Sequence, residues 1–222
     1  MAPLPLGKSV DILPRPMPER RVHEGASVRL EPLAETHVPS LWQAAQGADF
    51  SFSYLRYGPF ASEEAMAGGV LELSQRTSQP FWAVCPTPEG TAKGWLSLCD
   101  IEPANAAIEI GSVWYSPALQ RSRAATEAIF LLMRHAFDDL AYQRLVWRCA
   151  ALNAASQAAA RRYGFQREGI WRSAVVVKGW QRDVAWFSML ATEWPARKAA
   201  IGAWLADGNF TADGHALERL ER

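Results

Sequence analysis

The sequence carries no excess of charge of either sign. Its 222 residues hold 23 lysines and arginines against 23 aspartates and glutamates, so the formal net charge is zero. A protein that binds nucleic acid through a long-range positive field needs a basic excess, so this balance argues against a nucleic-acid partner. A local basic patch keeps that class open as a rival hypothesis, and its members would be Arg144, Arg148, Arg161 and Arg162.

Long apolar runs are also missing. No stretch approaches the roughly 20 apolar residues that span a bilayer. Pro3, Pro5 and Gly7 interrupt the N-terminus where a signal peptide would need its apolar stretch. We therefore expect a cytoplasmic protein with no membrane partner. A hydrophobic content of 49% with 21% charged residues predicts a folded globular chain with a full core.

Cysteine is scarce, and the chain contains only Cys85, Cys99 and Cys149. An odd number of widely spaced cysteines speaks against a disulfide framework, so we expect buried, reduced thiols. No pair has metal-ligand spacing, and the four histidines do not cluster, so we expect no metal. His135 falls among Arg134, Asp138 and Asp139 on the polar face of a helix, where we expect solvent around it.

What the sequence does contain is a strand, a proline break and an amphipathic helix in direct succession. Residues 107–115 form a β-branched, half-alternating segment that Pro117 ends. Apolar residues at helical spacing then predict a helix over about 121–140. The first amides of such a helix are unpaired and lie at the positive end of its dipole, so the turn is typical of a phosphate or pyrophosphate site. The alternative is a plain strand-to-helix turn packed in the core.

The remaining patterns predict an α/β (α+β) fold with a mixed, mostly antiparallel central sheet flanked by helices. An extended N-terminal arm (1–26) precedes the main domain (27–192), and a C-terminal helix with a loose tail (193–222) follows it. Further strands are expected near 27–33, 81–85, 93–101, 144–150, 168–177 and 183–192. Further helices are expected near 36–45, 62–76, 153–163 and 194–206.

This order, together with the turn after residue 117, resembles the GCN5-related N-acetyltransferase (GNAT) superfamily over about residues 27–192. Within it, the chain is similar to the ribosomal-protein N-terminal acetyltransferases (RimJ/RimL type). The family's acetyl-CoA loop has Gln or Arg, two residues, Gly, one residue, then Gly or Ala. Gln120 and Ala125 fit this pattern, whereas Arg121 and Arg123 stand where Gly is usual. A helix start at Asn153 and the Gly-Phe pair at 164–165 add to the resemblance.

The resemblance implies the GNAT acyl-CoA N-acyltransferase fold and direct transfer of acetyl from acetyl-CoA to a primary amine. The acceptor could be a small molecule, an aminoacyl conjugate or a protein N-terminus, and a homodimer is compatible with the sequence. The alternative is an acyl-CoA-binding module with weak or no turnover, motivated by the departures from the family pattern. The residues expected to hold the cofactor are Val113, Trp114, Gln120, Arg121, Ser122, Arg123, Ala124, Ala125, Thr126, Asn153 and Ser156.

Acyl transfer from a thioester needs a proton donor for the leaving thiolate. Many family members use a Tyr four residues before the Gly of the Gly-Phe pair, but this chain has Ala160 there. Ser156 is the substitute that we expect, and its alternative role is that of a hydroxyl that only caps the helix. Tyr163 is the second choice for the acid.

The acceptor ammonium must lose a proton, because an amine attacks only in its neutral form. Glu109 is the expected base, since it interrupts an apolar strand and burial would raise its pKa. The alternatives are a carboxylate facing solvent or paired with an Arg, a base acting through water, or the weaker candidates Glu168 and Asp183. The aromatic loop 50–60 would then wall the acceptor side, unless its own aromatics only pin it to the core.

Overall fold

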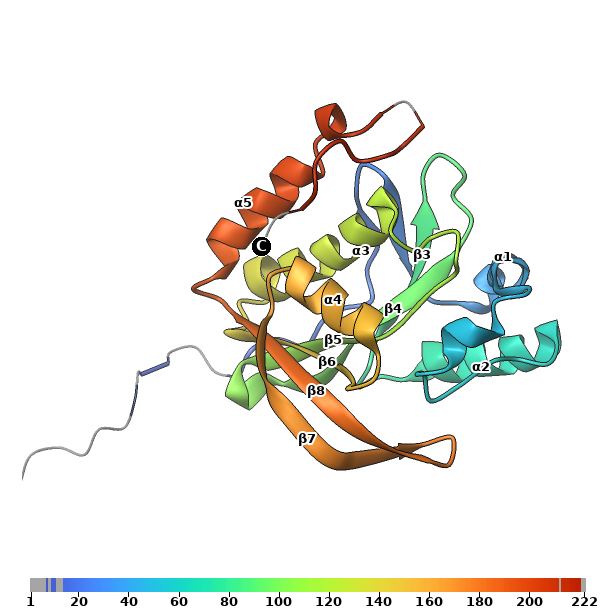
Figure 1. Ribbon diagram of the computed structural model, residues 1–222, viewed down its shortest axis with the longest axis horizontal. Coiled ribbons are helices and arrows are strands. Elements are labelled where there is room, and N and C mark those ends of the chain that lie inside the picture. Colours follow the sequence, from blue (N-terminus) through green and yellow to red (C-terminus); the bar gives the residue numbers. More distant parts are fainter. Residues whose placement is uncertain (1–6, 8, 11–13, 212, 221–222) are drawn as a thin grey trace, which may run out of the picture.

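A single eight-stranded sheet organises the chain in the computed structural model (Figure 1), which describes residues 7, 9–10, 14–211 and 213–220. Its strand order is β1-β2-β3-β4-β5-β6-β8-β7, and only β5 and β6 run parallel. The mixed, mostly antiparallel sheet flanked by helices is therefore confirmed. The strands are β1 (His23–Glu24), β2 (Val28–Pro32), β3 (Phe81–Pro86), β4 (Gly94–Glu102), β5 (Ala107–Tyr115), β6 (Arg144–Ala150), β7 (Gln166–Val177) and β8 (Trp180–Leu190).

Helices cover both faces of the sheet. The α-helices are α1 (Val38–Ala45), α2 (Glu63–Gln75), α3 (Arg123–Arg134), α4 (Ala154–Arg162) and α5 (Trp194–Trp204). Short 3-10 turns lie at Glu35–His37, Asp49–Phe52, Pro103–Asn105 and Asp207–Asn209. Figure 1 shows α3, α4 and α5 on one side of the strands and α1 and α2 on the other, and each group encloses its own hydrophobic core. No helix among the described residues has the length and apolar character needed to cross a membrane.

The alternation of side chains along β5 decides which residues face which core. Ile108 and Ile110 are fully buried in the core beneath α3, where they pack with Ala128 and Leu132. Because neighbouring strand residues point to opposite faces, Glu109 lies on the face covered by α1 and α2. The offset of one residue from Ile108 therefore places the Glu109 carboxylate on the sheet face opposite α3.

Helix α3 ends earlier than the periodicity predicts. A π-helical turn, His135–Asp139, follows Arg134, and the amide of Leu140 donates to the His135 carbonyl at 3.0 Å. A π-turn adds a residue to the helical repeat and so changes which side chains face inward. His135 is only 3% exposed and packs against His23, because it lies three, four and seven residues after buried positions of α3 and so shares their inward face. The prediction that solvent surrounds His135 was wrong.

Both chain ends are more closely packed than the sequence indicates. From Pro14 onward the N-terminal arm follows the domain, and β1 extends the sheet before the expected start at residue 27. At the other end, the Trp204 indole donates to the Glu218 carbonyl at 2.9 Å, and Leu220 is buried. The expected loose tail was therefore wrong for residues 213–220, which fold back onto α5. The segment 1–13 lies largely outside the described residues.

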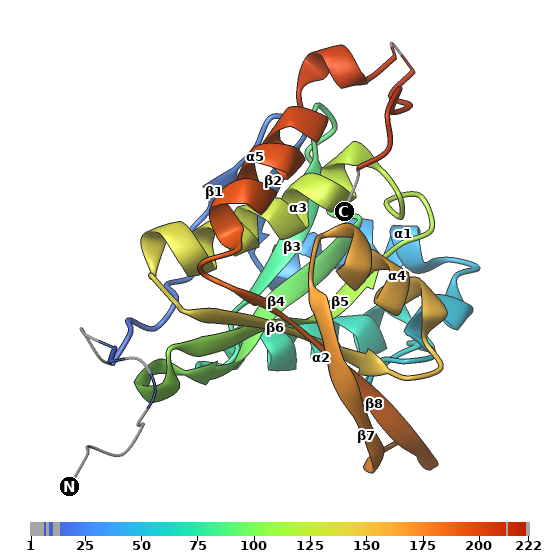
Figure 2. The same cartoon turned by 60° about the vertical axis from the view of Figure 1, so that its left-hand side comes forward.

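Strands β7 and β8 form a long hairpin that projects from the body of the molecule (Figure 2). Its two-residue turn consists of Lys178 and Gly179, with φ of 52° and 79°. Two successive positive φ angles are typical of the type I′ turn that suits a twisted hairpin. β7 ends at the predicted residue 177, whereas β8 starts at Trp180, closer to the turn than the predicted range 183–192.

Candidate active site

Strands β5 and β6 part halfway along their length. They pair in parallel at Ala107–Arg144, Ile108–Leu145 and Glu109–Val146, and no pair follows within the described residues, although β5 runs on to Tyr115 and β6 to Ala150. The unpaired halves leave an opening through the sheet, with free backbone groups at its edges. β5 and β6 therefore separate beyond Glu109 and Val146.

A bulge at Ser112 bends β5 at this opening. Trp95 pairs with Trp114 but Ser97 pairs with Gly111, so β5 has one extra residue there, and Ser112 has a φ of 51°. A bulge redirects the following side chains and backbone. Tyr57 fixes it by donating to the Ser112 carbonyl at 3.0 Å, and Gln79 donates to the Ser112 hydroxyl at 2.9 Å.

A cavity of about 420 Å³ lies at the opening. Its wall combines β5 and β6 with the start of α4, the loop before α2 and the β7–β8 hairpin. The cavity lining includes Glu109 from the α1/α2 side of the sheet and Ser156 from α4 on the other side. Both expected catalytic side chains therefore border one cavity that connects the two faces.

Glu109 is buried and tied to an arginine. Its side chain is only 7% exposed and accepts a short contact from Arg148 Nε, while the other side of that guanidinium contacts Asp100. Burial raises the pKa of Glu109 to about 8. The Arg148 charge beside it favours the carboxylate form, so the group can exchange a proton near neutral pH. A solvent-facing Glu109 is excluded, whereas the expected alternative of a pair with Arg is present.

Ser156 does more than cap its helix. Its backbone N–H donates to the Asn153 side chain at 3.1 Å, so Asn153 is the cap of α4. The Ser156 hydroxyl accepts from the Trp147 indole at 3.0 Å. An indole N–H can only donate, so the hydroxyl proton remains available to another acceptor. The Cys149 thiol lies next to this hydroxyl on the cavity wall.

The turn before α3 offers fewer free amides than its sequence indicates. The amides of Gln120, Ser122 and Ala125 donate to Ser116, Leu119 and the Ser122 hydroxyl, at 3.1, 3.2 and 3.0 Å. Thr126 also donates, to the Ser122 carbonyl at 3.3 Å. Among the described residues, the amides of Arg121, Arg123 and Ala124 have no such partner. A phosphate group would therefore meet three amides at the start of α3 rather than the full run from 120 to 125.

The two arginines at expected glycine positions have separate explanations. Arg121 has a φ of 63°, in the left-handed region that favours glycine. The Arg123 side chain points away from the turn, because it contacts the Leu205 carbonyl and binds Asp207 at 2.6 Å. Its guanidinium also lies 4.6 Å from the Phe210 ring centre. Arg123 thus ties α3 to the segment after α5.

Several expected cofactor contacts are restricted to the backbone. Trp114 is 1% exposed, and its indole donates to Ser51 within an aromatic group that includes Phe52 and Trp95. Thr126 is fully buried and its hydroxyl accepts from Arg162 at 2.7 Å. Val113 lines the cavity. The side chain of Trp114 is enclosed, so this residue could contact a ligand in the cavity only through its backbone.

The loop 50–60 is pinned to the core and also lines the cavity. Phe52 is fully buried and Tyr57 is bonded to Trp95 and Ser112, so the aromatics pin the loop to the core. The segment 54–57 nevertheless lines the cavity, and the Tyr54 hydroxyl donates to the Leu152 carbonyl at 3.0 Å. Tyr54 and Tyr57 thus both hold the loop and line the cavity.

The weaker catalytic candidates lie apart from the cavity wall. Glu168 binds Arg144, which lowers its pKa. Asp183 accepts from the Ser173 amide at 2.7 Å within the hairpin. Tyr163 is 4% exposed and packs against Trp147, and burial raises its pKa. Sequence patterns gave no sign of Gln79 or Arg182, and Arg148 was expected only in a basic patch, because the partners of these residues are distant in the chain.

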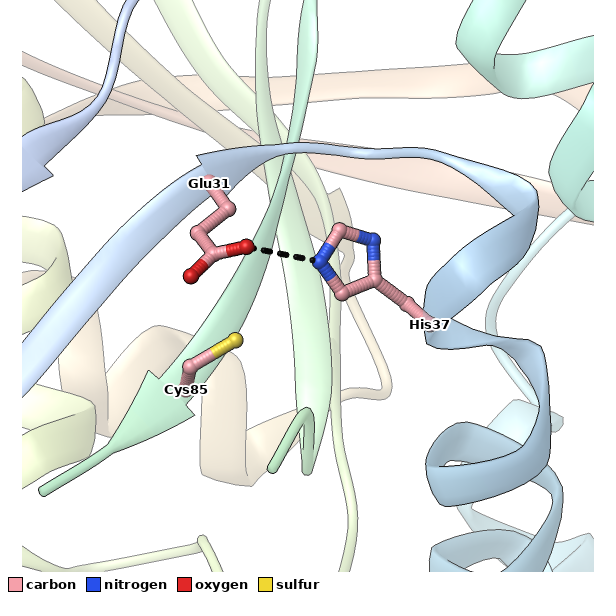
Figure 3. Close-up of side chains that lie close together, drawn as sticks. All are labelled: Glu31, His37 and Cys85. Carbon is pink, nitrogen blue, oxygen red and sulfur yellow. Dashed lines mark hydrogen bonds and ion pairs between the residues drawn. The ribbon is translucent and has the colours of Figure 1, made fainter. Parts of the chain in front are cut away.

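One group of metal-binding residue types was missed. The fold brings Glu31, His37 and Cys85 together, with their ligand atoms within 4.8 Å of one another, although their spacing in the sequence predicts no such set. Figure 3 shows the hydrogen bond between the His37 ring and Glu31, which measures 3.2 Å, with the Cys85 thiol beside it. The Ala34 amide donates to His37 Nδ1 at 3.1 Å, so the ring proton lies on Nε2 and is donated to Glu31. These bonds account for the arrangement of the imidazole.

The four arginines of the nucleic-acid hypothesis do not form one face. Arg144 binds Glu168, Arg148 binds Glu109, and Arg161 lies 5.5 Å from the Phe187 ring centre. Arg162 donates to Thr126 and lies 4.9 Å from the Trp204 ring centre. Each charge therefore has a local role within the fold.

Comparison with known proteins agrees with this geometry. Residues 27–166 match the family described as Acetyltransferase (GNAT) domain. A GCN5-related N-acetyltransferase from Brucella melitensis is 43% identical, with a TM-score of 0.92 over 95% of this chain and 96% of that one. A Bacillus subtilis (strain 168) protein named as a candidate ribosomal N-acetyltransferase, YdaF, is 31% identical over 110 residues, which are 50% of this chain. That alignment spans 60% of the curated relative.

A third relative has a more specific title. It is a Salmonella typhimurium acetyltransferase described as modifying the N-terminal serine of ribosomal protein L7/L12, and it is 27% identical with a TM-score of 0.64. The superposition covers 75% of this chain and 96% of that structure. The fold, the parted strands and the matched profile define a GNAT acetyltransferase domain, and the chain belongs to that family. Its relatives place it in the RimJ/RimL-like branch.

Proposed function

We propose that this protein transfers acetyl from acetyl-CoA directly to the amine of a peptide or protein N-terminus. The observation that carries the proposal is the position of Glu109 and Ser156 on opposite faces of the sheet but on one cavity. An acyl group held in the opening between β5 and β6 would have a proton acceptor on one side and a proton donor on the other. Acyl transfer to an amine needs both.

Cofactor binding would use the start of α3 and the edge of β5. The amides of Arg121, Arg123 and Ala124 suit a pyrophosphate at the positive end of the helix. The free backbone of the separated half of β5, around Val113, suits the amide-containing pantetheine chain. Bound there, acetyl-CoA supplies an activated thioester carbonyl. Its thiol end would lie toward Asn153 and Ser156, which border the cavity at the start of α4.

The two catalytic groups would act in sequence. Glu109 would take the proton from the acceptor ammonium, directly or through water, and the neutral amine would attack the thioester carbon. The carbon–nitrogen bond forms and the carbon–sulfur bond breaks. The leaving thiolate takes its proton from the Ser156 hydroxyl, and the second proton of the attacking nitrogen passes through water to the Ser156 oxygen. The proposed transfer passes through no acyl-enzyme.

The preference for an N-terminus is supported by the relatives. One is titled for modification of an N-terminal serine and another is named for ribosomal N-acetylation. The cavity is also bordered by the projecting β7–β8 hairpin, which provides an edge along which an extended chain could lie. Small amines and aminoacyl conjugates remain the competing acceptors.

A thiol-release assay tests the proposal. Purified protein would be mixed with acetyl-CoA and a panel of Ser-initiated peptides, free amino acids and polyamines, and free CoA thiol would be followed. The expected result is release with peptides that is lost when their N-terminus is blocked. Calorimetric binding of acetyl-CoA without release on any amine would instead establish the acyl-CoA-binding module.

A further inference from the structure

Cations outnumber carboxylates around the cavity. The lining contains Arg56, Arg76, Arg148 and Arg182 but only Asp100 and Glu109 as acids. Arg148 binds both of those acids, and Arg76 binds Glu72 at 2.6 Å. Among the described residues Arg56 and Arg182 have no carboxylate partner. The acceptor side of the site therefore carries two positive charges that the protein itself does not balance.

Arg182 is held in place with one nitrogen unused. Its Nη2 donates to the Ser53 carbonyl at 3.0 Å, and the guanidinium lies 5.5 Å from the Tyr54 ring centre. Its Nη1 is buried and lacks a hydrogen-bond partner within the described part of the chain. Burying an unsatisfied charged donor is costly. A fixed guanidinium with a free donor is suited to a carboxylate.

Neighbouring cations add to the field at this position. Lys178, from the hairpin turn, donates to the Phe52 carbonyl at 2.9 Å and also has no carboxylate partner among the described residues. Burial lowers the pKa of Lys178, and the charge of Arg182 lowers it further. Burial likewise lowers the pKa of Arg148, to which the charge of Arg56 contributes. Lys178 and Arg182 therefore repel each other, as do Arg148 and Arg56, and a bound anion would relieve this repulsion.

We propose that the acceptor is a peptide whose first few residues, beyond the amine that is acetylated, include an acidic side chain, and that Arg182 binds this carboxylate. The inference rests on the proposed function and names its substrate class. Arg56 and Lys178 would contribute attraction at longer range. An acceptor with a basic residue at that position would be repelled, so selectivity would come from both effects.

The test compares three peptides that differ at one position near the N-terminus, where they carry Asp, Ala or Lys. Thiol release would be measured with wild-type protein, Arg182→Gln and Arg182→Lys. The expected wild-type order of kcat/KM is Asp, then Ala, then Lys. Arg182→Gln should reduce the Asp-to-Ala ratio about tenfold, mostly through KM, because the variant loses a charge-assisted hydrogen bond to the acidic side chain. Arg182→Lys should restore part of the ratio.

Arg172→Gln is the matched control, because Arg172 is an exposed arginine on the same hairpin but outside this cavity. It should leave the ratio unchanged, which separates the specific contact from a general loss of charge. The melting temperature of each variant would confirm that it is folded. Free aspartate and free glycine serve as further acceptors, since an amino acid could supply the carboxylate itself.

Each outcome decides the proposal. Equal kcat/KM for the three peptides would overturn the inference and leave the proposed function intact. Acetylation of free amino acids with no peptide accepted would also overturn it, because the carboxylate would then belong to a small acceptor. If none of the acceptors supports thiol release, both the proposed function and this inference are rejected. Preference for the acidic peptide that disappears in Arg182→Gln but not in Arg172→Gln would establish it.

Discussion

The Trp147 indole donates its N–H to the Ser156 hydroxyl at 3.0 Å. This bond joins a strand that borders the opening in the sheet to the first turn of α4. Because an indole cannot accept, it occupies a lone pair of Ser156 and leaves the hydroxyl proton directed elsewhere. Trp147 is therefore a positioning residue for the proposed acid.

Replacing Ser156 by Ala should lower kcat about 10- to 100-fold, because the thiolate would then leave without a proton donor. The Kd of acetyl-CoA should change little, since the Asn153 cap of α4 accepts from the residue 156 backbone. Thiol-release kinetics measure kcat, and calorimetry measures the Kd of acetyl-CoA. Cys149→Ser is a control for the neighbouring thiol, and an unchanged kcat in Ser156→Ala would reject Ser156 as the acid.

The activity should rise with pH toward a plateau above about 8. Burial raises the pKa of Glu109 to about 8, so below this pH the group is increasingly protonated and cannot accept the amine's proton. Glu109→Gln should remove this limb of the kcat/KM profile and lower the rate about 100-fold or more. A profile in Glu109→Gln with the same rise would show that another group is the base.

The fold should lose stability on acidification between pH 6.5 and about 4. Burial, followed by the charge of His135, lowers the pKa of His23 to about 4. In this window the unfolded chain binds a proton that the folded chain does not, so unfolding becomes easier as pH falls. The shift corresponds to a loss on the order of 2 to 3 kcal/mol by pH 4. Urea unfolding of His23→Asn at both pH values should show a smaller decrease than wild type.

Arg123 and Arg121 should respond differently to substitution. Arg123→Gln removes the contacts with Asp207 and Phe210 and should lower the melting temperature by about 2–5 °C, while the Kd of acetyl-CoA changes less than about twofold. Arg121→Gln should weaken acetyl-CoA binding several-fold with little change in melting temperature. The reverse pattern would mean that Arg123, and not Arg121, attracts the pyrophosphate.

The features that sequence patterns predicted are those set by local chemistry. Asn153, expected at a helix start, is a cap whose side chain bonds an amide three residues ahead, so it could be recognised from a short segment. The order of elements along the chain and the fold followed from periodicity together with the family resemblance. Glu109 could be singled out because a carboxylate between two isoleucines is unusual in an apolar strand.

The features that were missed depend on contacts between distant segments. His135 is buried because it packs against His23, which is distant in the chain. Arg148 meets Glu109 across 39 positions, and Arg182 meets Ser53 across 129. The tail beyond α5 is held by Trp204 and Asn209, whose partners could not be identified before the chain was folded.

The most direct measurement is a crystal structure of the protein with CoA and a Ser-initiated peptide bearing an acidic residue. We predict the pyrophosphate on the amides of Arg121, Arg123 and Ala124. The CoA sulfur should lie within hydrogen-bond distance of Ser156 Oγ, and the peptide amine should lie on the Glu109 side of the opening. A sulfur on the far side of the sheet from Ser156, or a peptide amine that does not lie on the Glu109 side of the opening, would contradict the account.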